Sequence, residues 1–246
     1  MASVGAPVIE VEHVSKSFGV KVIDDLSITV GTGDALGIVG PNGAGKTTLL
    51  DLVAGDLRPD QGRIRLDGHD VTRQRADRRC RAGLARTAQV PRPFEQMTVF
   101  ENVLAAAVFG SGAPRRERDA LPDAVAALER THLLPRANAR AGDLGLLGRK
   151  RLELARALAT GPRVLLLDEI AGGLTEAEVA ELIDDVRAIR ADGVTIVWIE
   201  HVVHALLAVV DRMMAMSFGC KIAEGDPAVV MASPSVREVY LGVEPE

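Results

Sequence analysis

Two segments near the start of the chain alternate apolar with polar residues, at positions 8–12 and 26–30. A period of two is typical of strands with one buried face, so we expect half-exposed antiparallel strands there and a third at residues 64–68. Other short runs are almost entirely apolar, which indicates strands that are buried on both faces. These runs occupy residues 35–39, 164–167 and 194–199.

Helical periodicity covers several longer segments, and these are predicted to be helices. They are residues 98–108, 122–134, 151–159 and 176–191. Residues 110–116 are rich in Gly, Pro and Arg and are predicted to form a loop. Near the end of the chain we expect a hairpin of residues 213–216 with 221–224, followed by two short helices after Pro227 and Pro234.

The alternation of strands and helices predicts an α/β fold, with a mostly parallel sheet wrapped by helices and an antiparallel β part ahead of it. The character of the sequence changes near Pro91, where strand patterns give way to helical ones. We therefore expect residues 90–160 to form an all-helical subdomain inserted into that core.

Composition and charge limit the classes of protein to which the chain could belong. The 246 residues are 47% hydrophobic, which is ample for a buried core, and the formal net charge of −5 gives no global basic field for nucleic acid. Arginines cluster at residues 73–86 and 115–118, where interspersed acids favour a solvated helix face. Cys80 and Cys220 have no spacing typical of a zinc site or a disulfide framework, which favours reduced thiols in a cytosolic protein.

A direct membrane role is not expected. Residues 1–13 lack the basic and apolar regions of a secretory signal, and no apolar run is long enough to span a bilayer. Any association with a membrane is expected to come through a partner.

A glycine loop follows the apolar run at residues 35–39 and matches the phosphate-binding pattern G-x-x-x-x-G-K-[ST] in full. Strand, glycine loop and helix in that order let backbone N–H groups wrap a triphosphate at the positive end of the helix. Lys46 supplies a charge for the β- and γ-phosphates and the Thr47 hydroxyl a ligand for Mg²⁺. The predicted nucleoside-triphosphate-binding residues are Gly40, Pro41, Asn42, Gly43, Ala44, Gly45, Lys46, Thr47 and Thr48.

A second acidic site must decide between kinases, GTPases, helicases and transport motors, which all use such a loop. The apolar run at residues 164–167 ends in Asp168 and Glu169. Asp168 is predicted to hold Mg²⁺ through its water shell, and Glu169 to polarise the water that attacks the γ-phosphate. The guanine-specific N-K-x-D motif is absent from the sequence, which disfavours a GTPase.

From residue 8 to about residue 242, the chain resembles an ATP-binding subunit of an ABC transporter. Phe18 in VSKSFG matches the aromatic residue that stacks on adenine in this family. Gln89 in RTAQVPRPF resembles the glutamine that touches Mg²⁺ or the attacking water and links the site to the membrane subunit. His201 in VWIEHVVHA matches the histidine that contacts the γ-phosphate. The resemblance implies one cassette over residues 1–246, with ATP and Mg²⁺ as cofactors.

The resemblance also implies partners and a location. A second cassette, in a homodimer or a heterodimer, and transmembrane permease subunits are expected, with a solute-binding protein as an indirect partner and no nucleic acid. The chain would then lie in the cytoplasm on the inner face of the cell membrane. The stretches ARTAQVPRPFEQMTVFENVL and SPSVREVYLG resemble subunits of importers for branched-chain amino acids, amides and related small carboxylates.

The chain departs from the family at the signature L-S-G-G-Q, which faces the ATP of the partner cassette. Alignment on Arg151 places Gly145 at the serine, Leu146 at the first glycine, Leu147 at the second and Gly148 at the glutamine. A lost hydroxyl and an added side chain are expected to weaken the contact with the partner's ATP. Ile170 replaces the usual proline, and Thr175 the usual Asp or Asn, in the segment that crosses to the partner.

Three hypotheses follow. The favoured one is the ATP-hydrolysing motor of an ABC importer, with an exporter motor as an alternative in the same fold. The second is a regulatory cassette that binds ATP but hydrolyses it weakly, which the altered signature motivates. The third is an ABC ATPase that acts on nucleic acid or ribosomes, which the single cassette and the net charge of −5 disfavour.

Overall fold

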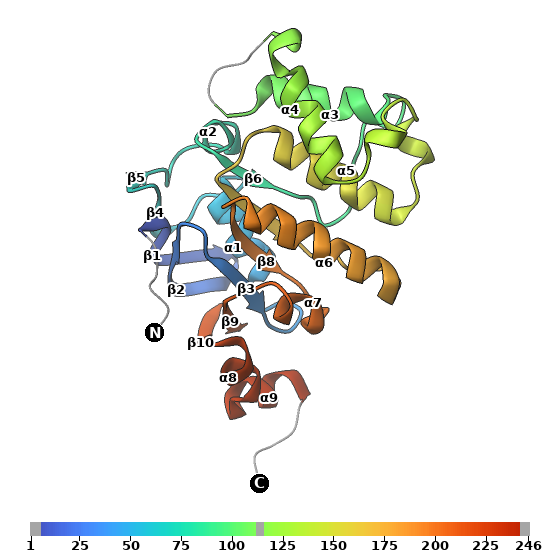
Figure 1. The fold of residues 1–246 in the computed structure, drawn as a ribbon. Helices are drawn as coiled ribbons and strands as arrows, with labels where there is room; N and C mark the ends of the chain where they lie inside the picture. The colour runs from blue at the N-terminus through green and yellow to red at the C-terminus, as the bar shows by residue number, and fades with distance from the viewer. Residues whose placement is uncertain (1–5, 112–115, 242–246) are drawn as a thin grey trace. The chain divides into compact units, whose positions relative to one another are not determined.

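The computed structural model of the chain describes residues 6–111 and 116–241. It divides into two compact units (Figure 1). The first contains the chain up to Ala76 together with the chain from Thr195 onward, and the second contains Asp77–Val194. No helix within the described residues is long and apolar enough to cross a membrane.

An antiparallel sheet of the first unit has the strand order β2-β1-β4-β5. Its strands are β1 (Pro7–Phe18), β2 (Val20–Gly31), β4 (Gln61–Leu66) and β5 (His69–Asp70). The predicted strands at residues 8–12 and 26–30 are confirmed, and that at 64–68 overlaps β4. The first two are longer than predicted because β1 and β2 form one long hairpin that turns at Gly19, where φ is 78°.

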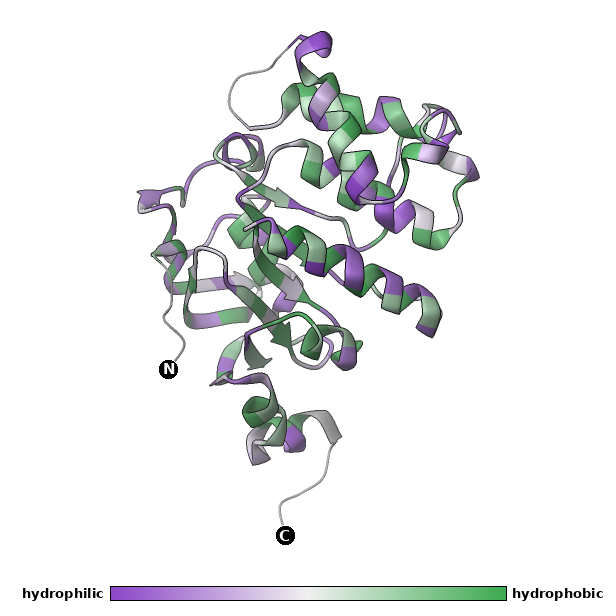
Figure 2. Ribbon diagram, viewed as in Figure 1, coloured by the Kyte–Doolittle hydropathy of each residue, from purple (hydrophilic) through white to green (hydrophobic). Residues whose placement is uncertain are grey.

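The other sheet strands of this unit lie in the order β10-β9-β3-β8. They are β3 (Ala35–Val39), β8 (Thr195–Ile199), β9 (Arg212–Ser217) and β10 (Cys220–Gly225). β3 runs parallel to β8 and to β9, and it is buried along its whole length, as is β8. Figure 2 shows β3 mainly in the green of hydrophobic residues, as its burial on both faces requires.

Helices complete the first unit. Helix α1 (Lys46–Ala54) follows β3, and α7 (Val203–Leu207) follows β8. The predicted hairpin near the end of the chain is confirmed as β9 with β10. The two short helices after it are also confirmed, as α8 (Pro227–Ala232) and α9 (Pro234–Leu241).

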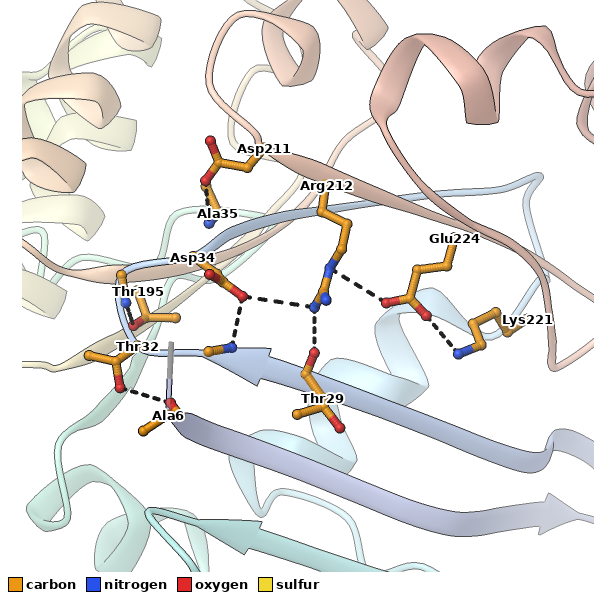
Figure 3. Close-up of polar contacts among 12 residues, drawn as sticks. Ala6, Thr29, Thr32, Asp34, Ala35, Thr195, Asp211, Arg212, Lys221 and Glu224 are labelled. Carbon is orange, nitrogen blue, oxygen red and sulfur yellow. Dashed lines mark hydrogen bonds and ion pairs between the residues drawn. The ribbon is translucent and has the colours of Figure 1, made fainter. Parts of the chain in front are cut away.

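A polar network joins the strands of the first unit at the beginning of β3 (Figure 3). The Arg212 guanidinium donates a hydrogen bond to the Thr29 carbonyl of β2 and lies 4.0 Å from Asp34 and 3.5 Å from Glu224. Asp34 also accepts a hydrogen bond from the N–H of Gly31 at 2.9 Å. Because these residues come from β2, β9, β10 and the turn before β3, the network fixes the start of the strand that carries the glycine loop.

The second unit contains two parallel strands, β6 (Leu84–Arg86) and β7 (Val164–Asp168). Its helices are α2 (which begins at Ala76 and ends at Arg81), α3 (Val99–Phe109), α4 (Glu117–Arg130), α5 (Leu146–Ala159) and α6 (Glu176–Ala191), with 3₁₀ turns at Leu134–Arg136 and Ala141–Asp143. Helices α3, α4 and α5 pack against one another. Thr98 and Thr175 begin α3 and α6 with reciprocal capping boxes.

Several boundaries differ from the prediction. Helix α4 begins at Glu117 and runs through Pro122, where its start was expected, and α5 begins at Leu146 instead of residue 151. Acidic residues in the first turn of α4 stabilise the earlier start through the helix dipole. In the predicted loop at 110–116, residues 112–115 lie outside the described residues.

The arginine cluster at residues 73–86 is not only a solvated helix face, and that interpretation is wrong for two of its members. Arg79 is fully buried in α2, and Arg86, at the end of β6, has a side chain that is only 19% exposed. Neither α2 nor β6 was predicted, because their apolar residues are too few to produce a clear period.

Candidate nucleotide site

The glycine loop follows the end of β3 and is shaped by three glycines with positive φ. Gly40, Gly43 and Gly45 have φ of 155°, 80° and 97°. A Cβ on Gly40 would lie 2.4 Å from the Met216 carbonyl oxygen, and one on Gly45 would lie 2.7 Å from that of Val22. Gly40 and Gly45 are therefore required both by the backbone conformation and by the close approach of β9 and β2.

Lys46 is the first residue of α1 and is 5% exposed. Its ammonium group donates hydrogen bonds to the carbonyl oxygens of Gly40 at 2.7 Å and Pro41 at 3.0 Å. The lysine thus lies back along the loop, with its charge next to the backbone that is predicted to wrap the phosphates.

The N-terminus of α1 provides the other part of an anion site. Gly45 is the N-cap residue and offers no side-chain capping bond. The first N–H groups of a helix have no intrahelical acceptor and form the positive end of its dipole, which favours phosphate. Of the remaining predicted ATP-binding residues, Asn42 and Thr47 are exposed, Thr48 is half-buried and Ala44 is buried.

The turn between β9 and β10 holds the glycine loop from the side. Gly219 donates its N–H to the Ala44 carbonyl at 3.1 Å and accepts a hydrogen bond from the N–H of Asp24 at 3.0 Å. A Cβ on Gly219 would lie 2.5 Å from the Val22 carbonyl oxygen. No local pattern could predict this support, since the contact joins residues 175 positions apart.

Phe18 and His201, the other two predicted contacts of the first unit, are accessible. Phe18 ends β1 and is 55% exposed, with the Lys16 ammonium 5.3 Å from its ring centre. His201 is exposed, two residues after β8. It follows Glu200, which is 1% exposed and whose Oε1 accepts the N–H groups of His201 at 2.9 Å and Val202 at 3.3 Å. Sequence reasoning missed this buried carboxylate, which orients the histidine backbone.

Asp168 ends β7 in the second unit and is 1% exposed. Its Oδ2 lies 2.8 Å from Nη2 of Arg86, and its N–H donates to the Thr87 hydroxyl at 3.2 Å. The carboxylate is therefore compensated by a charge from the neighbouring strand β6, a partner that the sequence did not predict.

Glu169 and Gln89 are brought together. The amide nitrogen of Gln89 donates to Oε2 of Glu169 at 2.5 Å. Glu169 is half-buried and has φ of 48°, a left-handed backbone conformation that is uncommon for a residue with a side chain. The predicted base and the predicted glutamine thus contact each other directly, on a strained turn after β7.

The altered signature lies at the start of α5. Gly145 is the N-cap residue, exposed and extended, and Leu146, Leu147 and Gly148 form the first turn. Leu146 is 42% exposed. A Cβ on Gly145 would meet nothing within 4 Å, so a serine would fit there without displacement. The same helix end also supports the Arg149 guanidinium, which donates to the carbonyls of Leu144 and Gly142, both at 2.9 Å.

The predicted site residues fall into the two units. The phosphate loop, Phe18 and His201 belong to the first, and Gln89, Asp168, Glu169 and the signature stretch belong to the second. Within the described residues, no group of three or more His, Cys, Asp and Glu side chains could hold a metal ion. Mg²⁺ in ATPases is held by substrate phosphates with one or two protein oxygens, so the donor chemistry of Thr47, Gln89 and Asp168 fits it.

Comparison with known proteins finds two sequence families that match parts of the chain. The sequence family described as ABC transporter matches residues 23–172, and the one described as branched-chain amino acid ATP-binding cassette transporter matches residues 220–246. BraF of Pseudomonas aeruginosa, a high-affinity branched-chain amino acid transport ATP-binding protein, is 34% identical over 250 residues, which cover 96% of this chain and 98% of BraF.

Two further similarities bear on function. LptB of Acidithiobacillus ferridurans, a lipopolysaccharide export system ATP-binding protein, is 36% identical over 223 residues, which cover 90% of each chain. The structure of the ADP conformation of MJ1267, an ATP-binding cassette of an ABC transporter, matches with a TM-score of 0.88 and 31% identity, over 96% of this chain and 99% of MJ1267.

Proposed function

Because this chain belongs to the ATP-binding cassette family of ABC transporters, whose members hydrolyse ATP, we propose that it powers an importer for branched-chain amino acids or related small amino-acid, amide or carboxylate solutes. Its fold is the mixed α/β P-loop cassette that the sequence predicts. The observation that carries the solute class is the match of residues 220–246 to the branched-chain amino acid family.

The phosphate loop supports ATP binding by this chain. Backbone N–H groups at the start of α1 and the Lys46 ammonium, now bonded to two loop carbonyls, would meet the β- and γ-phosphates. The exposed ring of Phe18 would stack on adenine, and His201 would contact the γ-phosphate. When bound, Mg²⁺ would neutralise phosphate charge, held by Thr47, Gln89 and Asp168.

Glu169 would orient and polarise the attacking water. In the structure its Oε2 accepts the hydrogen bond from Gln89, so this bond must loosen before the same oxygen can accept a water proton. Gln89 would then contact water or metal. The half-buried position of Glu169 limits the number of other solvent molecules that compete for it.

Partners complete the proposal. A second cassette would bind against this chain, with Gly145, Leu146, Leu147 and Gly148 facing its ATP, and permease subunits would hold both cassettes at the inner face of the membrane. Residues 90–160 would act as the helical subdomain of the single cassette and pass motion to the permeases together with the Gln89 segment. A solute-binding protein would deliver the solute on the other side.

Uptake in cells tests the proposal. In a strain that lacks this chain, uptake of labelled leucine at low concentration should be lost and restored by the native chain but not by Glu169→Gln. The matched control is Glu176→Gln, an exposed acid in the first turn of α6. Unchanged uptake of leucine and related solutes in the deleted strain would contradict the importer assignment, and the similarity to LptB would then direct attention to export.

The weakly hydrolysing cassette is a second candidate. Leu147 at a glycine position and Gly145 at a serine position favour it, since both reduce contact with the partner's phosphate. Steady-state phosphate release by the purified chain, with and without its partner cassette, separates the two. Release that stays near background even with the partner would support this candidate.

A further inference from the structure

Three side chains from one face of α5 hold the segment that contains Gln89. Lys150, Glu153 and Arg156 are spaced by three residues and therefore project from the same side of the helix. Glu153 accepts the N–H of Arg92 at 2.9 Å, and Arg156 donates to the Arg92 carbonyl at 3.1 Å and to Glu153 at 2.9 Å. The segment at residues 89–92 is thus bound through its main chain to the helix that begins with the signature.

Lys150 reaches further than the other two. Its ammonium group donates to the carbonyl oxygen of Gln89 at 3.0 Å and to that of Glu169 at 3.1 Å. It is 5% exposed, and a charge so deeply buried must keep hydrogen-bond partners. Together with the bond between the Gln89 amide and the Glu169 carboxylate, these contacts form a closed ring of three residues.

The bond to the Glu169 carbonyl falls on a strained residue. A non-glycine residue in the left-handed region is strained and persists only where its surroundings hold it. Glu169 has φ of 48°, and Lys150 donates its hydrogen bond to the carbonyl oxygen of this same residue. The same carbonyl also accepts the N–H of Gly172 at 3.4 Å, a longer bond, so loss of the lysine would weaken the hold on the turn after β7 and let the carboxylate shift.

We infer that Lys150 is a positioning residue for hydrolysis: it fixes the backbone of Glu169 and Gln89 together and couples both to the N-terminal half of α5. This inference rests on the proposed ATPase function. It goes beyond that function because Lys150 lies outside the phosphate loop, the acidic pair and the signature. It would also link the end of α5 that is proposed to face the partner with the base that polarises the attacking water.

The consequence is a specific kinetic signature. Lys150 lies in the second unit, whereas the phosphate loop belongs to the first, so we expect its loss to spare ATP binding. A displacement of about 1 Å at a reacting group costs on the order of 10²-fold in rate. We therefore expect Lys150→Met to lower kcat by about 10- to 100-fold while the Kd for ATP changes by less than about threefold.

The experiment compares variants of the purified full-length chain. Lys150→Arg keeps a buried donor and should recover kcat to within about fivefold of the native value. Arg151→Lys, on the next residue, is the matched control. It keeps its charge but weakens a two-bond contact with Asp185, whose distances are 2.7 Å and 3.4 Å, and should lower thermal stability with little effect on kcat.

A double variant separates positioning from general damage. In the Glu169→Gln background the base is already lost, so adding Lys150→Met should lower the residual rate by less than about threefold. Either of two results with the single variant overturns the inference: Lys150→Met leaves kcat of the folded protein within twofold of native, or it weakens ATP binding as much as it lowers kcat. The inference is also overturned if Lys150→Met lowers the residual rate of Glu169→Gln by the same factor as it lowers kcat of the native chain. Absence of turnover by the native chain with its partner would instead refute the proposed function. If Lys150→Met does not fold, Lys150→Gln replaces it with the same expectations.

Discussion

The signature position Gly145 offers a gain-of-function test. Gly145 begins α5 in an extended conformation, with φ of −65° and ψ of 176°, and has no side chain to cap the helix. Serine is a favoured N-cap residue in this conformation. Because a Cβ there would meet nothing within 4 Å, Gly145→Ser restores the hydroxyl of the family signature without steric cost.

Stability and activity should both rise. Replacing Gly by Ser at an N-cap contributes a few tenths of a kcal/mol, which already includes the reduced freedom of the unfolded chain. A gain of about 0.3–0.5 kcal/mol raises Tm by roughly 1–2 °C in a chain of this size. A hydrogen bond to a charged phosphate contributes about 1.5–3 kcal/mol, which corresponds to roughly 10- to 150-fold. Since Leu147 remains, we expect the lower end, about tenfold.

Steady-state phosphate release at subsaturating ATP measures the activity, and thermal unfolding measures the stability. Gly145→Ala is the control, because it removes the same glycine but carries no hydroxyl and is a poor cap. We expect it to leave Tm nearly unchanged and phosphate release at the native level. If Gly145→Ser raises Tm but releases phosphate no faster than Gly145→Ala, the assignment of Gly145 to a phosphate contact is wrong.

Three other predictions follow. Backbone and hydroxyl bonds from Thr175 lower the pKa of Glu178 below its ordinary 4.5, so the carboxylate stabilises the fold above pH 4.5 and loses this effect as pH falls through the lowered pKa; Glu178→Gln should flatten the fall in urea-unfolding free energy between about pH 5 and 3. Arg86→Ala removes a charged partner of the buried Asp168 carboxylate, so it should cost about 1.5–3 kcal/mol in urea unfolding, and Asp168→Asn should restore part of that loss. Gly45→Ala places a Cβ 2.7 Å from a carbonyl oxygen of β2, at φ of 97°, and should weaken ATP binding at least about tenfold by calorimetry. The control is Gly193→Ala, whose Cβ would meet nothing within 4 Å and which therefore tests the effect of positive φ alone.

Local patterns were sufficient for much of the fold. Alternation at residues 8–12 and 26–30 and fully apolar runs at 35–39 and 164–167 predicted strands that the structure contains, because burial on one face or two leaves a direct record in the sequence. The glycine loop was also readable, since its φ values exclude most other residues.

Element ends were less readable. The start of α5 was placed at residue 151, whereas its first turn begins at Leu146. Gly145 and Gly148 are poor helix formers, and their low propensity masked the helix, which is held by packing against α3 and α4. Pro122 was taken as a start for a related reason, since proline is unfavourable inside a helix.

The supporting residues of the site could not be predicted at all. Arg86 pairs with Asp168 across 82 positions, and Lys150 reaches Gln89 across 61. Such contacts depend on how strands and helices pack, and no period or spacing in the chain encodes them. Arg86 compensates the charge of the buried Asp168 carboxylate, and Lys150 holds the turn at Glu169. The sequence therefore predicted the residues of the site, but not the residues that hold them in position.

Binding of ATP with Mg²⁺ to the purified chain, measured by titration calorimetry for the native protein and Lys46→Ala, tests the central claim most directly. Lys46 bonds two loop carbonyls now and is proposed to bond phosphates instead when ATP is present. We expect the native chain to bind ATP and Lys46→Ala to lose at least about tenfold in affinity, equivalent to about 1.4 kcal/mol. No measurable binding by the folded native chain, or equal affinity in both proteins, would contradict the account.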